Sequence, residues 1–395
     1  MTQLHAQADE RTRLLKGARR IVVKLGTATV TDREGGMCRE RVEPIAQSIS
    51  TLMKAGRQVI LVSSGAVGLG RAWLGLRSSH KLDVVTKQAC AAVGQSLLMN
   101  AYKEMFGAFD VKVAQVLLTE SDFAVWRRYS NLCHTIDKLL QFGVLPIINE
   151  NDTVSTAELQ AIAAGGRTAA FSDNDRLAAL VMSGLEADAL ALLTNVDGLL
   201  RKMPSKTPSK TPSLGLRNKN ATPAEVIPLV TEITTELRKL AAGPSGGGRG
   251  GMTTKLEAAD IAMRCGGAAV IADGRMPGVL DRVFKGEAVG TAFLPRKKMK
   301  GKHRWIAFAA DVQGCVMLSA AAKAALSKDQ TSLLISGIAR IKSRFAAKDV
   351  VSLVDRQGRE FARGIATCSS HDAEESLGRT GGSLIVIRRD NIVFL

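Results

Sequence analysis

The feature that most constrains the fold is a short apolar run that ends in a lysine and a glycine. Residues 21–23 are Ile-Val-Val, which is typical of a strand buried on both faces of a parallel sheet. Lys24 stands where this strand should end, and Gly26 allows a tight turn directly after it. Ligands of open α/β sheets collect at such carboxyl ends of strands. The run therefore fits a phosphate site. A solvated lysine followed by an ordinary turn would give the same sequence.

The order of strand, turn and helix recurs along the chain. Residues 41–55 carry apolar side chains at helical spacing and precede a second buried strand at 58–62. Further apolar strands are expected at 111–118, 144–148, 187–193 and 270–272. After residue 304 the pattern changes to short strands punctuated by glycine. We therefore predict an α/β protein, with a three-layer αβα domain around a mainly parallel sheet and a small, mostly β domain behind it.

These patterns also predict the domain boundaries. We expect a loose N-terminal arm at residues 1–19, an α/β domain at 20–295, a linker at 296–303 and the β domain at 304–395. A low-complexity Pro-Ser-Lys-Thr repeat lies within a basic stretch at about 201–222. Such a segment cannot bury enough apolar surface to fold, so we expect a disordered insert there.

The net charge of +17 is concentrated in two places. Residues 201–222 hold six Lys or Arg and no acid, and residues 296–363 hold 15 Lys or Arg against five acids. The rest of the chain is nearly neutral, which argues against a protein that binds nucleic acid over its whole surface. The six cysteines form no C-x-x-C pair, so neither a zinc site nor a disulfide framework is indicated. Without an 18-residue apolar run or a signal peptide, a cytoplasmic protein with no membrane association is expected.

Two other strand ends and one helix start carry polar residues. Ser63-Ser64-Gly65 follows the strand at 58–62, and a helix beginning there would aim backbone N–H groups at an anion, unless the loop is only a flexible turn. Asn-Glu-Asn-Asp at 149–152 is costly to bury unless it meets water, a metal or a ligand, although a capped loop would also explain it. Asp175 precedes a predicted helix, where it would at least favour the helix dipole.

Lys24 and Lys255 both lie beside glycines at strand ends or helix starts. Two lysines on either side suit a phosphoryl group in transfer, because charge on its oxygens must be neutralised. Lys255 is followed by Leu256, which excludes a P-loop, and no G-x-G-x-x-G follows the first strand. None of the five histidines falls in these loops. That pattern fits an acceptor that is already anionic, such as a carboxylate, which needs no general base.

Several blocks along the chain then carry a family resemblance. They are Val-Val-Lys-Leu-Gly-Thr at 22–27, Ser-Gly-Ala at 64–66, Lys-Gln at 87–88, Ala-Ala-Val-Gly-Gln at 91–95, Ile-Asn-Glu-Asn-Asp at 148–152, Asp-Asn-Asp at 173–175, Gly-Gly-Met at 250–252 and Thr-Lys at 254–255. In this order they resemble the glutamate 5-kinases of the amino acid kinase family, and the segment from Lys302 through Ile338 resembles the PUA domain that follows many such kinases. The resemblance implies ATP-dependent, Mg2+-assisted phosphorylation of L-glutamate to L-glutamyl 5-phosphate, the first step of proline biosynthesis.

The resemblance also implies residue roles. Lys24 would bind the ATP phosphates, Lys255 would stabilise the transferring phosphoryl group, and Asp175 would orient both lysines. Glutamate would be held by Ser64, Asp152 and Asn174, and no residue is assigned to a metal. The ATP site would be lined by Lys24, Thr194, Asn195, Gly250, Gly251, Met252, Thr253, Thr254 and Lys255. The chain departs from the family at Asn195, where aspartate is usual, and at Arg249, where threonine is usual, and both changes bear on nucleotide affinity.

Other hypotheses stay open from the sequence. A sister kinase acting on aspartate, acetylglutamate or a nucleoside monophosphate shares the lysines and glycines, while the block at 149–152 favours free glutamate. The basic C-terminal domain also fits an RNA-binding protein with a relic kinase, against which the intact Lys24, Asp175 and Lys255 argue. The expected partners are L-glutamate and ATP, RNA at the C-terminal domain, and further copies in a homo-oligomer. Since no reductase domain follows, a separate glutamyl phosphate reductase is expected.

Overall fold

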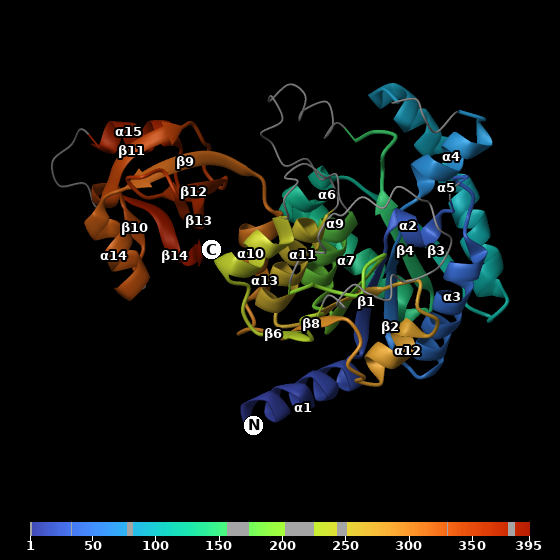
Figure 1. The fold of residues 1–395 in the computed structure, drawn as a ribbon. Coiled ribbons are helices and arrows are strands. Elements are labelled where there is room, and N and C mark those ends of the chain that lie inside the picture. Colours follow the sequence, from blue (N-terminus) through green and yellow to red (C-terminus); the bar gives the residue numbers. More distant parts are fainter. Residues whose placement is uncertain are drawn as a thin grey trace, which may run out of the picture. The chain divides into compact units, whose positions relative to one another are not determined.

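The computed structural model describes residues 2–32, 34–76, 82–155, 174–201, 225–242, 251–329, 331–377 and 384–395 (Figure 1). The chain folds into two compact units. The first unit holds Met1–Glu120 and Cys133–Lys298, and the second holds Ser121–Leu132 and Met299–Leu395. The basic insert expected at about 201–222 lies, after Arg201, outside the described residues.

The first unit is built on an eight-stranded sheet in its described part, with the order β3-β4-β2-β1-β5-β7-β8-β6. The strands are β1 (Arg20–Leu25), β2 (Gln58–Val62), β3 (Val113–Leu118), β4 (Leu145–Glu150), β5 (Ala189–Thr194), β6 (Leu229–Val230), β7 (Ala268–Asp273) and β8 (Thr291–Phe293). The strands from β3 to β7 in this order run parallel, and β8 pairs antiparallel with β7. All of β1 after Arg20 is buried, as expected for the centre of a parallel sheet. The prediction of a mainly parallel sheet is confirmed.

Helices cover both faces of this sheet (Figure 1). Those of the first unit are α1 (Thr2–Gly17), α2 (Thr27–Val30), α3 (Arg39–Lys54), α4 (Ala66–Trp73), α5 (Val84–Gly107), α9 (Asn174–Leu185), α10 (Thr235–Ala242), α11 (Met252–Arg264) and α12 (Val279–Phe284). Side chains of α3, α5 and α12 form one core with alternate residues of β1, namely Ile21, Val23 and Leu25. On the other face α9 packs against α11 and β1. This confirms the three-layer αβα arrangement.

The N-terminal segment differs from the expected loose arm. It forms α1, whose Leu15 is buried in the core. Arg11 is also buried, and its guanidinium donates to the carbonyl oxygens of Pro228, Glu287 and Val289 at 3.2, 3.0 and 2.6 Å. Carbonyl groups that are distant from α1 in the sequence thus hold the helix in place. The local composition of residues 1–19 does not indicate these contacts.

The second unit is a mostly β domain, as predicted. Its described residues form a six-stranded sheet with the order β10-β14-β13-β12-β9-β11. The strands are β9 (Val312–Leu318), β10 (Leu333–Leu334), β11 (Ile338–Ser343), β12 (Val350–Val354), β13 (Glu360–Ala366) and β14 (Ile385–Phe394). The helical elements are α13 (Gly301–Arg304), the π-helical turn η1 (Trp305–Ala309), α14 (Ala320–Asp329), the 3-10 turn η2 (Ile335–Gly337) and α15 (Ser370–Leu377).

The short segment Ser121–Leu132 belongs to this second unit, although it comes long before the rest of it in sequence. It contains most of α6 (Glu120–Ala124) and the start of α7 (Trp126–Gln141). The indole of Trp305 donates to the carbonyl oxygen of Phe123 at 2.9 Å and meets the Trp126 ring edge-on, with 5.4 Å between centroids. A domain boundary predicted from the sequence does not reveal that this early segment belongs to the second unit.

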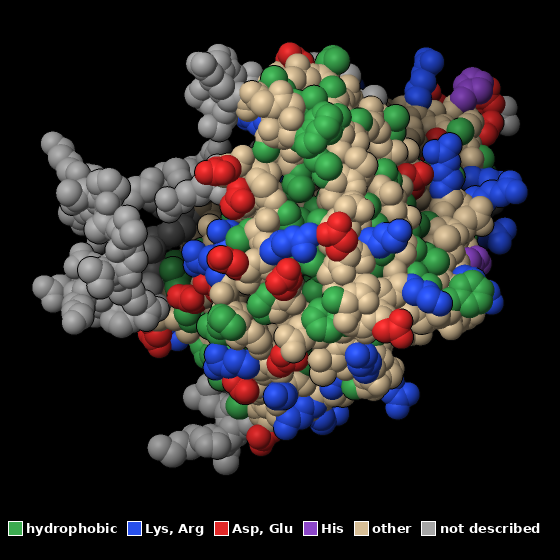
Figure 2. Space-filling model, turned by 90° about the vertical axis from the view of Figure 1, so that its right-hand side faces the viewer, with side chains coloured by type: hydrophobic (Ala, Val, Ile, Leu, Met, Phe, Trp, Pro, Cys, Tyr) green, Lys and Arg blue, Asp and Glu red, His purple; other side chains and the backbone are tan. Residues whose placement is uncertain are grey.

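Charged side chains of both signs are interspersed on the face that Figure 2 shows. This face belongs to the side of Figure 1 where α3, α4 and α5 lie. No helix among the described residues has both the length and the apolar character that crossing a membrane requires.

Candidate active site

Parallel pairing brings several strand ends to one edge of the first unit's sheet. Lys24 of β1 lies opposite Val62 of β2 and Leu192 of β5 in the register of the sheet. The loops that follow these strands therefore meet, and with the end of β4 they enclose a cavity of about 430 Å³. Of the residues predicted for the site, those that line the cavity are Lys24, Ser64, Asp152, Asn174, Thr194, Asn195 and Lys255.

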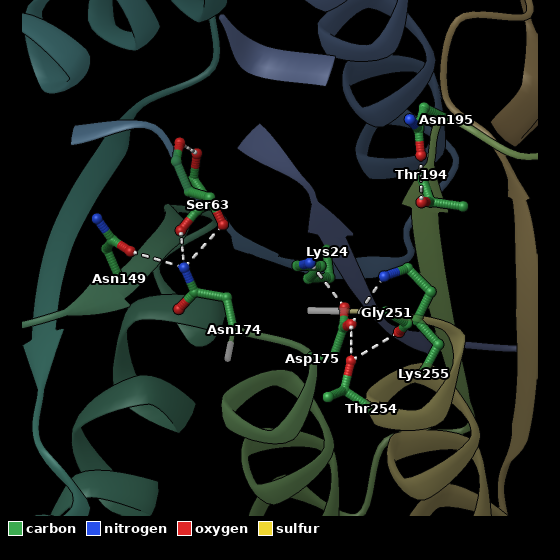
Figure 3. A network of polar contacts seen from close by, with 11 residues as sticks. Lys24, Ser63, Asn149, Asn174, Asp175, Thr194, Asn195, Gly251, Thr254 and Lys255 are labelled. Atoms are coloured by element: carbon green, nitrogen blue, oxygen red, sulfur yellow. Dashed lines mark hydrogen bonds and ion pairs between the residues drawn. The ribbon is translucent and has the colours of Figure 1, made fainter. Parts of the chain in front are cut away.

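A buried carboxylate holds the two lysines at this edge. Asp175, on the first turn of α9, is fully buried and lies 2.7 Å from Lys24 Nζ through Oδ1 and 3.0 Å from Lys255 Nζ through Oδ2 (Figure 3). The Thr254 hydroxyl lies 3.0 Å from Asp175 Oδ2 and 2.9 Å from the carbonyl oxygen of Gly251, so it donates to either acceptor. Three separate elements, β1, α9 and α11, thus place one ion cluster.

The electrostatics of this cluster favour an anionic ligand. Burial alone would raise the pKa of Asp175, but the charges and hydrogen bonds of Lys24 and Lys255 outweigh it and hold the pKa below its usual value. The carboxylate is therefore ionised near neutral pH, and it pairs with both lysines. Both lysines also line the cavity, where their ammonium groups can attract an anionic ligand.

Helix N-termini add to this positive potential. Helix α4 begins at the cavity after Gly65, whose φ of 109° is readily adopted only by glycine. Helix α11 begins after Gly251 and carries Lys255 in its first turn. The N-cap residue of each helix is a glycine, which has no side chain to accept from the first N–H groups, so these groups can bind an anion.

A row of neutral carboxamides occupies another part of the cavity wall. Asn174 Nδ2 lies 2.8 Å from Ser64 Oγ, 3.1 Å from the carbonyl oxygen of Ser63 and 3.2 Å from Asn149 Oδ1 (Figure 3). Asn149 Nδ2 in turn donates to Oε1 of Gln95 on α5 at 2.9 Å. These groups can orient a polar substrate without adding charge.

The ends of β5 and β7 form the side of the site that contains Thr194 and Asn195. Arg275 donates through Nη2 to the backbone oxygen of Asn195 at 2.8 Å and pairs with Asp273 through Nε and Nη2. Burial would raise the pKa of Asp273, but the hydrogen bonds and charge of Arg275 lower it overall. The backbone at Asn195 is thus held by an ion pair on the neighbouring strand.

The structure brings most of the predicted residues together. Thr254 contacts Asp175, and Gly251 accepts from Thr254, whereas Met252 and Thr253 open α11 beside them. Gly250 lies outside the described residues. The candidate list lacked nine cavity-lining residues from the same loops and two supporting residues, namely Gly26, Thr27, Ala28, Gly65, Ala66, Val67, Gly68, Asn149 and Glu150, with Gln95 and Arg275 as the supporting residues. The loop residues adjoin predicted strand ends and could have been found from them, but the roles of Gln95 and Arg275 depend on contacts between distant segments.

Comparison with known proteins covers both units. Residues 19–273 match the Amino acid kinase family, and residues 314–385 match the PUA domain. The chain is 40% identical to the glutamate 5-kinase of Caldanaerobacter subterraneus subsp. tengcongensis over 95% of this chain and 98% of that protein. It is 40% identical to the glutamate 5-kinase of Citrifermentans bemidjiense over 98% of this chain and 100% of that protein. The solved UMP kinase of Bacillus anthracis aligns with a TM-score of 0.44 at 16% identity, over 70% of this chain and 96% of that chain.

Proposed function

Since this chain belongs to the amino acid kinase family, and within it to the glutamate 5-kinases, we propose that its cavity is where ATP phosphorylates L-glutamate. The side-chain carboxylate accepts the phosphoryl group and becomes L-glutamyl 5-phosphate, which begins proline biosynthesis. The observation that carries this proposal is the pair of lysines held by one buried carboxylate at the cavity.

The lysines supply the electrostatics of phosphoryl transfer. Lys24 binds the ATP phosphates, and Lys255 neutralises the oxygens of the group in transfer, where charge must be stabilised most strongly. Asp175 touches neither substrate in this scheme, because both of its oxygens are engaged with the lysines and Thr254. It is a positioning residue that fixes the separation of the two ammonium groups.

The acceptor end of the cavity uses polar groups of a different kind. Ser64 and Asn174 are joined by a hydrogen bond, and Asp152 lines the same cavity. A carboxylate at Asp152 attracts the α-ammonium group of a free amino acid. The carboxylate acceptor of glutamate is ionised near neutral pH, so the reaction needs no general base.

The nucleotide and its magnesium ion occupy the side of the site formed by Thr194, Asn195 and the start of α11. Magnesium keeps several of its waters and binds phosphate oxygens together with one or two protein groups, rather than a closed protein cage. The site has the chemistry for this arrangement, since both lysines line the cavity and can bind phosphate, and Glu150 adds a carboxylate to the lining. When bound, the ion neutralises charge on the β- and γ-phosphate oxygens.

A competition among acceptors tests the assignment. We expect ADP release to be faster with L-glutamate than with L-aspartate, N-acetyl-L-glutamate or UMP, each at the same concentration with ATP and Mg2+. The Asp175→Ala variant serves as the control, because it removes the group that holds both lysines. Faster turnover on any of the three competing acceptors would contradict the proposal.

The PUA domain supports a second candidate function, RNA binding by the C-terminal unit. Its residues 299–363 carry 12 Lys or Arg and five acids, and cations of this kind neutralise RNA phosphates. The proposal further includes a homo-oligomeric cytoplasmic enzyme. An acyl phosphate is a reactive product, so a separate reductase has to consume it.

A further inference from the structure

Gln95 is a buried carboxamide that the proposed chemistry does not use directly. It lies on α5, is 8% exposed, and accepts through Oε1 from Asn149, which lines the cavity. Its Nε2 is buried and has no hydrogen-bond partner in the described part of the chain. An unpaired buried donor destabilises a fold, so packing alone would favour an apolar side chain of similar length. The oxygen of Gln95 is therefore the part that needs an explanation.

The order of donors and acceptors in this row is fixed from its other end. The backbone oxygen of Ser63 can only accept, so the atom of Asn174 that lies 3.1 Å from it must be a donor, Nδ2. This nitrogen also faces Asn149 at 3.2 Å, where Asn149 must then present Oδ1. Asn149 is left with Nδ2 toward Gln95, which must present its oxygen. The polarity of the row thus follows from hydrogen bonding alone.

The same polarity fixes one wall of the cavity. Asn174 Nδ2 faces three acceptors, on Ser63, Ser64 and Asn149, and its Oδ1 is buried and has no partner among the residues that the structure describes. Asn149, Asn174 and Asp152 line the same cavity. A substrate there meets a wall of fixed hydrogen-bond polarity and a carboxylate, and the carboxylate suits the α-ammonium group of a free amino acid.

We propose that Gln95 is a positioning residue for the amino-acid substrate. Its oxygen locks the orientation of Asn149, and Asn149 in turn holds Asn174, so that this wall of the cavity keeps the arrangement that receives the amino-acid substrate. The inference rests on the proposed function, because it takes the substrate to be L-glutamate. Gln95 itself touches no substrate and acts through its two neighbours in the row.

Three variants of the full chain test this role. Gln95→Met keeps the length of the side chain but removes its acceptor, and we expect the KM for glutamate to rise about tenfold while the KM for ATP stays within about twofold. Gln95→Glu keeps an oxygen opposite Asn149, and burial favours its uncharged form, so the glutamate KM should stay within about threefold of wild type. Ser96→Ala, an exposed change on the same helix, is the matched control and should behave as wild type.

The outcomes separate this inference from the proposed function. A folded Gln95→Met variant with an unchanged glutamate KM would overturn the role of Gln95, as would an equal rise in both KM values. If Gln95→Met does not fold, Gln95→Glu decides, because a tenfold rise in its glutamate KM despite the retained oxygen would also overturn the role. A wild-type protein that releases no ADP with glutamate would instead remove the proposed function itself.

Discussion

The two ends of the cavity differ in their polar groups, which are charged at one end and neutral at the other. At the lysine pole, which consists of Lys24, Asp175 and Lys255, all groups are charged and almost fully buried. At the amide pole, which consists of Ser64, Asn149 and Asn174, the groups are neutral and form a row of hydrogen bonds. Charge is concentrated where a phosphoryl group changes its own charge distribution. Neutral groups are placed where a substrate only has to be recognised.

The two poles should therefore respond differently to substitution. Removing one partner from a buried ion cluster leaves an uncompensated charge, which typically lowers the free energy of unfolding by about 3–5 kcal/mol. A neutral hydrogen bond contributes only about 0.5–1.5 kcal/mol to the same free energy. We expect large losses in turnover at the lysine pole and smaller losses, mainly in substrate affinity, at the recognition end.

The largest effect is expected from Lys255→Ala at the lysine pole. Loss of a preorganised cation beside the transferring phosphoryl group should lower kcat on the order of 100-fold or more, with a much smaller change in the KM for glutamate. Steady-state kinetics with varied glutamate measure both constants. Lys239→Ala removes an exposed lysine from the neighbouring helix α10 and is the control. A change confined to KM would show that Lys255 binds substrate rather than the transition state.

A smaller effect of the opposite kind is expected from Asp152→Ala. Its proposed partner is the α-ammonium group, and a hydrogen bond to a charged group contributes about 1.5–3 kcal/mol, so the glutamate KM should rise about 10-fold to 100-fold. The kcat value should fall much less. Asp152→Asn separates charge from hydrogen bonding, since it keeps an acceptor oxygen. If Asp152→Ala lowered kcat and left KM intact, Asp152 would act on the phosphoryl transfer and not on the binding of the α-ammonium group.

The smallest effect is expected from removal of the second unit after Pro295. Both poles belong to the first unit, so the shortened chain should keep glutamate kinase activity within roughly tenfold, about 1.4 kcal/mol in barrier. Phe123 and Trp126 lose Trp305 as a partner in this chain, and a lower solubility is expected. Loss of phosphotransfer in a shortened chain that circular dichroism shows to be folded would mean that the second unit helps to build the site. RNA binding by the full and shortened chains, titrated with salt, would show whether the basic region contributes.

Much of the fold could be predicted because its strands are continuous apolar runs. Residues 58–62 were expected as a strand and form β2 with the same ends. Such runs are local signals, since burial on both faces of a strand leaves little choice of side chain. The N-terminal helix was missed because Arg11 is held by carbonyl groups more than 200 positions away.

The candidate site likewise contains residues that the sequence reveals and residues that only the structure reveals. Lys24 and Thr194 end strands that the sequence reveals, and strand ends of one parallel sheet must meet. Gln95 and Arg275 are different, because neither ends a strand and each acts on a residue from another segment. The family resemblance named the block that contains Gln95 but gave it no role. Only the spatial arrangement shows which of its atoms is engaged.

The placement of Ser121–Leu132 in the second unit has a consequence for synthesis of the chain. Phe123 is 1% exposed in the finished fold, and its neighbour Trp126 meets Trp305. Trp305 leaves the ribosome 173 residues after Leu132, which takes about 9–35 s at typical elongation rates. During that interval the Trp126 ring lacks Trp305, the aromatic side chain against which it packs in the finished fold. We expect a chaperone to bind the segment Ser121–Leu132 during this interval.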